Sequence, residues 1–209
     1  MFREIDLDNW NRKTTFEFFK DYPDPFFNIT ANIDVTRLRE YCRRNGLAFS
    51  LASLFLSQLA ANAVPEFRRR IIGESVVEFE IIHATQTVLN DDETFSFCYF
   101  EQQPDIFEFD RCGRIAREKY RGIKSFDVES DRIDLIYYSV IPWVSFTAFK
   151  HASRLDNRQS VPRIVFGGIF EDSAGGVKMP VSVEVHHALA DGLHVGRYFN
   201  GIQERVNSL

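Results

Sequence analysis

A doubled histidine near the C-terminus is the first candidate for chemistry in this 209-residue chain. His186 and His187 are followed by three small or apolar residues and then by Asp191 and Gly192. A neutral imidazole can take a proton from a hydroxyl group near pH 7 and return it later in the reaction. No nucleophile stands beside the pair, so the pattern predicts a general base that acts directly on a substrate. The alternative is that one histidine is a buried structural residue and Asp191 caps a helix.

The residues on either side of the histidines predict a strand followed by a helix. Between Val181 and Val185, valines alternate with polar residues, which is the period of a half-buried strand. After Gly192, apolar residues recur at helical spacing as far as Val206. The histidine pair therefore lies where a strand ends and the aspartate where a helix begins, and such a junction can hold an imidazole rigidly.

The stretch from His186 to Arg197, His-His-Ala-Leu-Ala-Asp-Gly-Leu-His-Val-Gly-Arg, resembles the active-site signature of the chloramphenicol acetyltransferases, a trimeric CoA-dependent family. Its shorter His-x-x-x-Asp-Gly core is also found in dihydrolipoamide acyltransferases and condensation domains. Two further segments are similar to the same family: residues 10–17, which match Trp-x-Arg-(Lys/Arg)-x-x-Phe-Glu, and residues 142–147, Pro-Trp-Val-Ser-Phe-Thr. The resemblance covers the chain from Trp10 to the final helix.

This resemblance implies direct transfer of an acetyl group from acetyl-CoA to an acceptor hydroxyl, without an acyl-enzyme. The second histidine of the motif, His187, would be the general base, and the first would pack or hydrogen-bond structurally. Ser139, three residues before the Pro-Trp pair, would donate a hydrogen bond to the tetrahedral oxyanion, and such a donor lowers a barrier by roughly 3 kcal/mol. Arg12 would form an ion pair with Asp191 that fixes the catalytic turn. The structural alternatives are a strand-end serine and an exposed arginine.

An aromatic acceptor pocket is also implied by the resemblance, together with a homotrimer. One subunit supplies the pocket and its neighbour supplies the histidine, which places three active sites at the subunit interfaces. The matching substrate-binding positions are Phe18, Phe19, Phe27, Phe95, Phe126, Phe149 and His151.

Three positions depart from the family pattern, and all of them lie on the acceptor side. Phe19 stands in place of a tyrosine, and His151 in place of a leucine. Val165 or Phe166 stands where the family has a threonine that holds a water. A second hypothesis is therefore a different small hydroxyl acceptor. Further alternatives are another acyl carrier, such as lipoamide, and a non-catalytic trimeric binding protein of the same fold.

Composition and element order bound the fold. With 209 residues and 44% hydrophobic residues, the chain predicts one domain over residues 1–209 with a sizeable core. The 21 phenylalanines suit an apolar ligand pocket or a subunit interface as well as a core. Strand and helix patterns mix without strict alternation, which favours an α+β fold, a two-layer α/β sandwich with a mixed sheet. The resemblance specifies this as the CoA-dependent acyltransferase fold.

Charge and cysteine content argue against several classes of partner. The net charge is −5, and no basic block argues for nucleic acid. The short run Arg68–Arg70 predicts a solvated helix end. The three cysteines have no metal-ligand spacing, so we expect reduced thiols and no metal site. No signal peptide and no apolar run of membrane-spanning length is present, so we expect a soluble, cytoplasmic enzyme.

Overall fold

A computed structural model describes residues 1–125, 132–152 and 159–209, so Phe126 lies outside the described residues. The described elements are, in chain order, β1 (Phe2–Glu4), α1 (Lys13–Phe19), β2 (Phe26–Asp34), α2 (Thr36–Asn45), α3 (Phe49–Asn62), the 3₁₀ helix η1 (Pro65–Arg68), β3 (Arg69–Ile72), β4 (Ser75–Phe79), β5 (His83–Leu89), β6 (Phe95–Phe100), α4 (Ile106–Tyr120), β7 (Leu135–Ile141), β8 (Arg163–Gly167), β9 (Phe170–Glu171), β10 (Val177–His186) and α5 (Gly192–Asn207).

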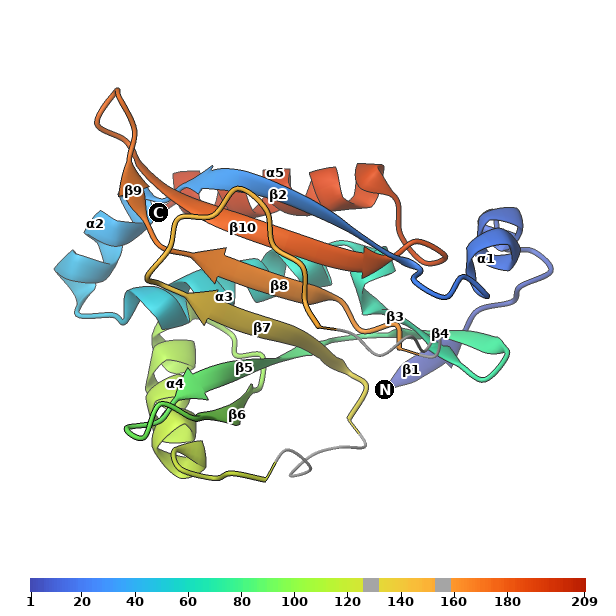
Figure 1. The fold of residues 1–209 in the computed structure, drawn as a ribbon, viewed down its shortest axis with the longest axis horizontal. Coiled ribbons are helices and arrows are strands. Elements are labelled where there is room, and N and C mark those ends of the chain that lie inside the picture. The colour runs from blue at the N-terminus through green and yellow to red at the C-terminus, as the bar shows by residue number, and fades with distance from the viewer. Residues whose placement is uncertain (126–131, 153–158) are drawn as a thin grey trace.

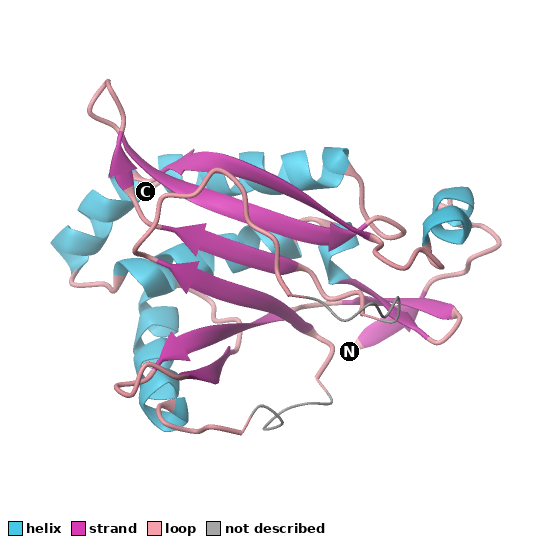
Figure 2. Ribbon diagram, in the orientation of Figure 1, coloured by secondary structure: helices cyan, strands magenta, loops and turns pink. Residues whose placement is uncertain are grey.

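A large mixed sheet forms the centre of the molecule (Figure 1). Its strand order is β2-β10-β8-β7-β5-β6, with the short strand β9 paired to β10. The pairs β5–β7 and β7–β8 are parallel, and the remaining pairs are antiparallel. Helices α3, α4 and α5 cover one face of this sheet, and a small sheet of order β1-β4-β3 lies at the end nearer α1 (Figure 2). The predicted two-layer α+β sandwich with a mixed sheet is confirmed.

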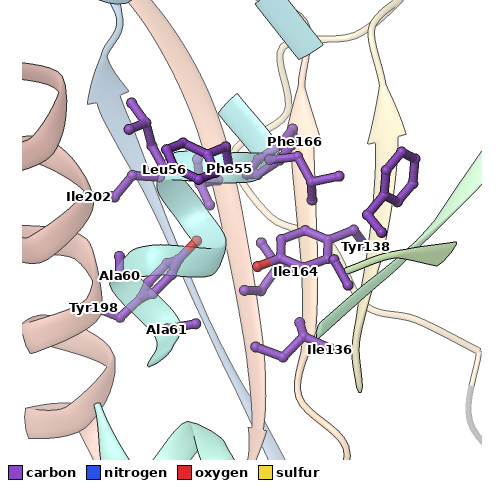
Figure 3. Packing of buried hydrophobic residues seen from close by; sticks show 14 of the residues in the cluster. Phe55, Leu56, Ala60, Ala61, Ile136, Tyr138, Ile164, Phe166, Tyr198 and Ile202 are labelled. Atoms are coloured by element: carbon purple, nitrogen blue, oxygen red, sulfur yellow. The ribbon is translucent and has the colours of Figure 1, made fainter. Parts of the chain in front are cut away.

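The core lies between the large sheet and helix α3, whose residues are mostly apolar. Figure 3 shows Phe55 and Leu56 of α3 beside Phe166 of β8, with side chains of α5 on the other side of the helix. Burial of such side chains contributes about 25 cal/mol for each Å² of apolar surface removed from water. The hydroxyls of Tyr138 and Tyr198 also lie in this core, and both hydrogen-bond to Ser57 Oγ, at 3.0 and 2.6 Å. These three buried hydroxyls thereby satisfy one another.

The opposite face of the large sheet, which we call the polar face, carries Ser139, Arg163, Ser182, Glu184 and His186. On β10 the three valines between residues 181 and 185 lie in the core, so the residues that alternate with them point to the polar face. The strand register aligns Ser139 with Val165 and Val165 with Ser182, which places Ser139 on the same face. The chain that follows β7 crosses this face before it returns to β8 (Figure 1).

The prediction that Arg68–Arg70 forms a solvated helix end is wrong. Arg70 is only 1% exposed, and burial lowers the pKa of its guanidinium. Arg69 is ion-paired with Glu66 at 2.9 Å and with Glu78 at 3.1 Å. The Arg70 guanidinium donates hydrogen bonds to the backbone carbonyls of Phe67, Arg69, Ile133 and Leu135. The run ties the small sheet to the segment that enters β7, a partner more than 60 residues away in the sequence.

The state of the cysteines and the character of the helices relate to the expectations of reduced thiols and of no membrane-spanning segment. All three cysteines are free thiols. Among the described residues, no helix has the length and apolar character needed to cross a membrane.

Candidate active site

The turn between β10 and α5 carries the histidine motif, and its backbone is pinned on both sides. The amide of His187 donates to the carbonyl of Pro25 at 2.8 Å. The amides of Leu189 and Ala190 donate to the carbonyl of His186 at 3.0 and 3.1 Å, which closes the turn. His186 itself is buried, with Nδ1 accepting from the amide of Ala188 at 3.2 Å. The first histidine is therefore buried and hydrogen-bonded within the turn, and the second projects from a fixed backbone.

The imidazole of His187 is clamped between aromatic rings. It stacks on Phe19, with ring centroids 4.0 Å apart and planes 9° apart, and Phe27 lies against it at 4.7 Å. Its Nδ1 is 3.3 Å from Asp191 Oδ1, and the side chain remains 34% exposed. Because Nδ1 faces the carboxylate, Nε2 is the nitrogen left to exchange a proton with a substrate. The ring is thus held in one orientation and remains accessible.

Arg12 supports this turn from the start of α1. Its guanidinium contacts both oxygens of the Asp191 carboxylate, with Nη1 on Oδ2 and Nη2 at 3.2 Å from Oδ1. The same Nη2 donates to the carbonyl of His187 at 3.2 Å. The hydrogen bond from Arg12 holds the pKa of Asp191 below its ordinary value, although partial burial acts in the opposite sense. The expected ion pair is therefore present, and it fixes both the aspartate and the backbone of the histidine.

His194 is a second support that the sequence analysis missed. Its Nδ1 accepts from the amide of Asp191 at 2.8 Å, so its proton resides on Nε2, which lies 3.7 Å from Glu66 Oε1. Burial lowers the pKa of His194, which favours this neutral form. The available signal was its position three residues after the N-cap aspartate, where a side chain can reach back to the N-cap amide.

Ser139 lies toward the other end of the large sheet from His187. The register places it level with Ser182, two strands away on β7. His187 is five residues beyond Ser182, which amounts to about 16 Å along the strands, and two strand spacings add about 10 Å across them. Within one chain, the serine and the histidine are therefore too far apart to contact one reacting carbonyl.

The predicted pocket residues fall into separate groups. Phe19 and Phe27 lie against His187, and Phe18, which is 62% exposed, lies beside Phe19 with ring centroids 4.9 Å apart. Phe95 is on β6, at the edge of the sheet farthest from β2. Phe149 lies with His151 in the segment that crosses the polar face, their rings 4.9 Å apart. Lys150, between Phe149 and His151, is paired with Asp24 at 2.6 Å, so this segment lies beside the loop that leads into β2.

His151 belongs to a buried charged cluster with Glu184 and Arg163, which the sequence analysis also missed. Glu184 Oε1 is 2.6 Å from Arg163 Nη1, and the two residues are only 2% and 5% exposed. The amide of His151 donates to Glu184 Oε2 at 3.4 Å, and His151 Nδ1 lies 3.8 Å from the same oxygen. Burial acts to raise the pKa of Glu184, but His151 and Arg163 together hold it below its ordinary value. The carboxylate therefore stays ionised beside a predicted pocket residue.

An apolar cavity of about 240 Å³ lies at the ends of β7 and β8, beginning one residue after Ser139. The backbone of Gly168, which lines the cavity, packs closely against that of Pro142, because a Cβ on Gly168 would lie 2.7 Å from the carbonyl oxygen of Pro142. Val165, one candidate for the threonine position, is fully buried and level with Ser139, and Phe166 lines the cavity. The cavity is lined by Phe49, Ser50, Ser53, Val140, Pro142, Phe166, Gly167, Gly168, Ile169 and Met179. Its walls come from α3, β7, β8 and β10, so no single stretch of sequence predicts it.

The described residues contain no group of three or more His, Cys, Asp or Glu side chains placed to hold a metal ion.

Comparison with known proteins gives a consistent result. The chloramphenicol acetyltransferase family model matches residues 1–203. A chloramphenicol acetyltransferase of Proteus mirabilis is 28% identical over 96% of this chain and 92% of its own length, and one of Clostridium perfringens is 29% identical over 99% and 95%. A solved chloramphenicol acetyltransferase structure superimposes with a TM-score of 0.90 at 25% identity, over 99% of this chain and all of the other. A dihydrolipoamide acetyltransferase of Azotobacter vinelandii shares the fold, with a TM-score of 0.67 at 14% identity over 92% and 85% of the two chains.

Proposed function

Because this chain belongs to the chloramphenicol acetyltransferase family of acyltransferases, we propose that it transfers the acetyl group of acetyl-CoA directly to a small hydroxyl acceptor. The observation that carries the proposal is His187, an accessible imidazole clamped by two aromatic rings with Nδ1 turned to Asp191. Nε2 takes the proton of the acceptor hydroxyl as its oxygen attacks the thioester carbonyl. The tetrahedral intermediate then collapses, the carbon–sulfur bond breaks, and the proton passes from His187 to the departing CoA thiolate.

Ser139 is proposed to donate a hydrogen bond to the oxyanion of that intermediate. Its separation from His187 within one chain means that the two residues must come from different copies. We therefore propose a homotrimer in which His187 of one subunit faces Ser139 of the next. The exposed aromatic residues around His187, such as Phe18 and Tyr22, suit burial at such an interface.

Arg12 and Asp191 are proposed as positioning residues rather than substrate contacts. Arg12 is almost fully buried and binds both the carboxylate and the His187 carbonyl, so its donors are directed into the turn. Asp191 stabilises the imidazolium that forms when His187 takes a proton. One contiguous core joins the large sheet to its helices, and we accordingly propose that residues 1–209 act as one domain.

The apolar cavity beside Ser139 is the proposed site for the arm that carries the thioester. Its walls are almost entirely apolar, and it begins next to the proposed oxyanion donor. A thioester bound in this cavity, at the ends of β7 and β8, would place its carbonyl group near Ser139.

The charged cluster on the polar face favours an acceptor other than chloramphenicol as a second candidate. His151, Glu184 and Arg163 place ionised and hydrogen-bonding groups at a predicted substrate position, where an apolar side chain is the family pattern. A polar wall suits an acceptor that presents its own hydrogen-bonding group there.

Release of free thiol from acetyl-CoA by the purified protein, with and without chloramphenicol, tests the proposal. Drug-dependent release that is lost in His187→Ala would support both the chemistry and the drug as acceptor. Release only with other small hydroxyl compounds would support the chemistry and identify a different acceptor. No release with any hydroxyl compound tested would contradict the proposed transfer.

A further inference from the structure

A second carboxylate–histidine pair lies on the polar face, apart from the pair that Asp191 forms with His187. His151 Nδ1 is 3.8 Å from Glu184 Oε2, and this nitrogen is buried without a hydrogen-bond partner among the described residues. The His151 side chain as a whole is 17% exposed, and Nε2 is the ring nitrogen that solvent can reach. The pair therefore repeats the arrangement at His187, in which one nitrogen faces a carboxylate and the other is open.

The other two members of this charged cluster are turned away from solvent. Arg163 donates from Nη1 to Glu184 Oε1 at 2.6 Å and from Nη2 to Gln159 Oε1 at 3.0 Å, and its guanidinium lies 4.5 Å from the centre of the Phe26 ring. Arg163 and Glu184 are both almost completely buried. His151 is therefore the member of the cluster that a ligand can touch.

Glu184 decides which hydrogen-bonding group His151 offers to that ligand. The Glu184 carboxylate is ionised beside Arg163, so it attracts a proton to the nitrogen that faces it, Nδ1. Arg163 already balances the carboxylate charge, so the ion pair is complete without a charged imidazole. A neutral imidazole has one N–H group, and with the proton on Nδ1 the nitrogen Nε2 carries a lone pair. His151 thus accepts a hydrogen bond, which suits a hydroxyl or amino group and not a nitro or carboxylate group.

The cluster lies on the same face as Ser139, at a separation that one small acceptor can span. Glu184 is two residues beyond Ser182, which is level with Ser139, so the two positions are about 7 Å apart along the strands and about 10 Å across them.

Aromatic rings lead from the ends of β7 and β8 to His151. Phe146 packs against Gly167, where a Cβ would lie 3.0 Å from its ring. The centroid of the Phe146 ring is 5.8 Å from that of Phe149, which in turn is 4.9 Å from that of His151. Such a wall fits an acceptor with an aromatic body, because aromatic rings pack well against one another.

We infer that His151 selects the acceptor by accepting, through Nε2, a hydrogen bond from a hydroxyl or amino group at the end of the molecule far from the acetylated hydroxyl. The acceptor class is a small aromatic alcohol that carries such a donor. The inference rests on the proposed function, because it takes His187 and Ser139 as the reacting end of the site. It assigns a specificity role to a residue that takes no part in the proton transfer.

Thiol release from acetyl-CoA with three compounds of one skeleton tests the inference. Chloramphenicol and thiamphenicol carry a nitro and a methylsulfonyl group at the para position of the ring, and both groups only accept hydrogen bonds. The amine made by reducing the nitro group of chloramphenicol carries a hydrogen-bond donor at the same position. His151→Leu removes the lone pair and keeps a side chain of similar size, and Lys150→Gln is the matched control on the same exposed segment.

We expect the wild-type chain to use the amine about tenfold better than the other two compounds in kcat/KM, mainly through KM. A nitro group would leave Nε2 without a donor, which costs a site more than a hydrogen bond contributes. His151→Leu should lose this preference and Lys150→Gln should keep it. Mass spectrometry of the products identifies the acetylated atom.

Nitrogen-15 NMR of the histidine-labelled chain tests the same assignment without any acceptor. The chain has five histidines, so the signals that vanish in His151→Leu belong to His151. We expect these signals at pH 8 to be those of a neutral ring with the proton on Nδ1 and the lone pair on Nε2.

The possible outcomes separate the inference from the proposed function. A proton on Nε2 of His151 would overturn the inference even where acetyl transfer is observed. An amine that is used no better than chloramphenicol by the wild-type chain, whether both react or neither does, would also overturn it. Transfer to any hydroxyl compound that depends on His187 would then leave the proposed function standing. If His151→Leu slows all three compounds by the same factor and the preference survives, His151 has a merely structural role and the inference is wrong.

Discussion

Two arginine–carboxylate pairs lie along strand β10 and differ in what surrounds them. Arg12 and Asp191 meet just beyond the end of the strand, where the Asp191 side chain is 38% exposed. Arg163 and Glu184 face each other across neighbouring strands, and both side chains are almost completely buried. The first pair fixes a turn that water can reach on the Asp191 side, although Arg12 itself is almost fully buried. The side chains of the second pair are shielded from water, so the stability of each charge depends on the other charge.

The largest expected effect is on turnover, through His187, the residue that the exposed Arg12–Asp191 pair positions. His187→Ala removes the proposed base, and we expect turnover to fall by about a thousandfold, the usual contribution of a positioned general base. The unfolding temperature should stay close to that of the wild-type chain, because the side chain is partly exposed. Thiol release and thermal unfolding on the same preparation measure both. Turnover that is unchanged in this variant would remove His187 from the mechanism.

The next largest effect is on stability, and it concerns the buried pair. Glu184→Ala leaves the Arg163 guanidinium buried without its carboxylate, and we expect a loss of about 3 kcal/mol in the free energy of unfolding. The double substitution Arg163→Met, Glu184→Met removes both charges and should recover most of that loss. Urea unfolding at one fixed protein concentration measures both variants. If Asp191→Ala destabilises the chain more than Glu184→Ala, the contrast between the two pairs is wrong.

The exposed Arg12–Asp191 pair should contribute less to the free energy of unfolding than the buried pair, and its contribution should depend on pH. Arg12 holds the pKa of Asp191 below the ordinary value of 3.8, so the pair stabilises the folded chain above that pH. The contribution is lost as the pH falls from 3.8 toward the lower folded-state pKa. We expect Asp191→Asn to cost about 1 kcal/mol at pH 7, because the carboxylate is partly solvated, and progressively less as the pH falls below 3.8. A difference between the two proteins that does not narrow at any pH below 3.8 at which the chain stays folded would mean that the carboxylate charge contributes nothing.

The two pairs also show how far the sequence can predict this protein. The valine alternation before His186 and the apolar run of α3 predict their elements because those signals are local. Arg12 and Asp191 are 179 residues apart, and only the resemblance to a known family linked them. Arg163 and Glu184 meet through strand register, and the carbonyls of Ile133 and Leu135 that bind Arg70 are more than 60 residues away, so neither arrangement is visible in the order of residues. The separation of Ser139 from His187 likewise follows from the sheet order rather than from either motif.

The smallest expected effect tests whether the exposed turn needs its second support. Asparagine at position 194 places Oδ1 where the histidine has Nδ1, so His194→Asn can keep the hydrogen bond from the Asp191 amide while losing the contact with Glu66. Alanine at the same position loses both. An N-cap interaction contributes about 1 kcal/mol, so we expect His194→Ala to lower kcat about fivefold and His194→Asn to stay within about twofold of wild type.

The KM for acetyl-CoA should not move in either His194 variant, because the support acts on the imidazole of His187 and not on the donor site. A merely structural role for His194 would lower the unfolding temperature of the two variants without separating their kcat values. Equal kcat losses in the two variants would instead assign the effect to the Glu66 contact. The turn would then depend on the ion pairs that join Glu66, Arg69 and Glu78 at the small sheet. The comparison between the exposed pair and the buried pair would then have to include these ion pairs as well.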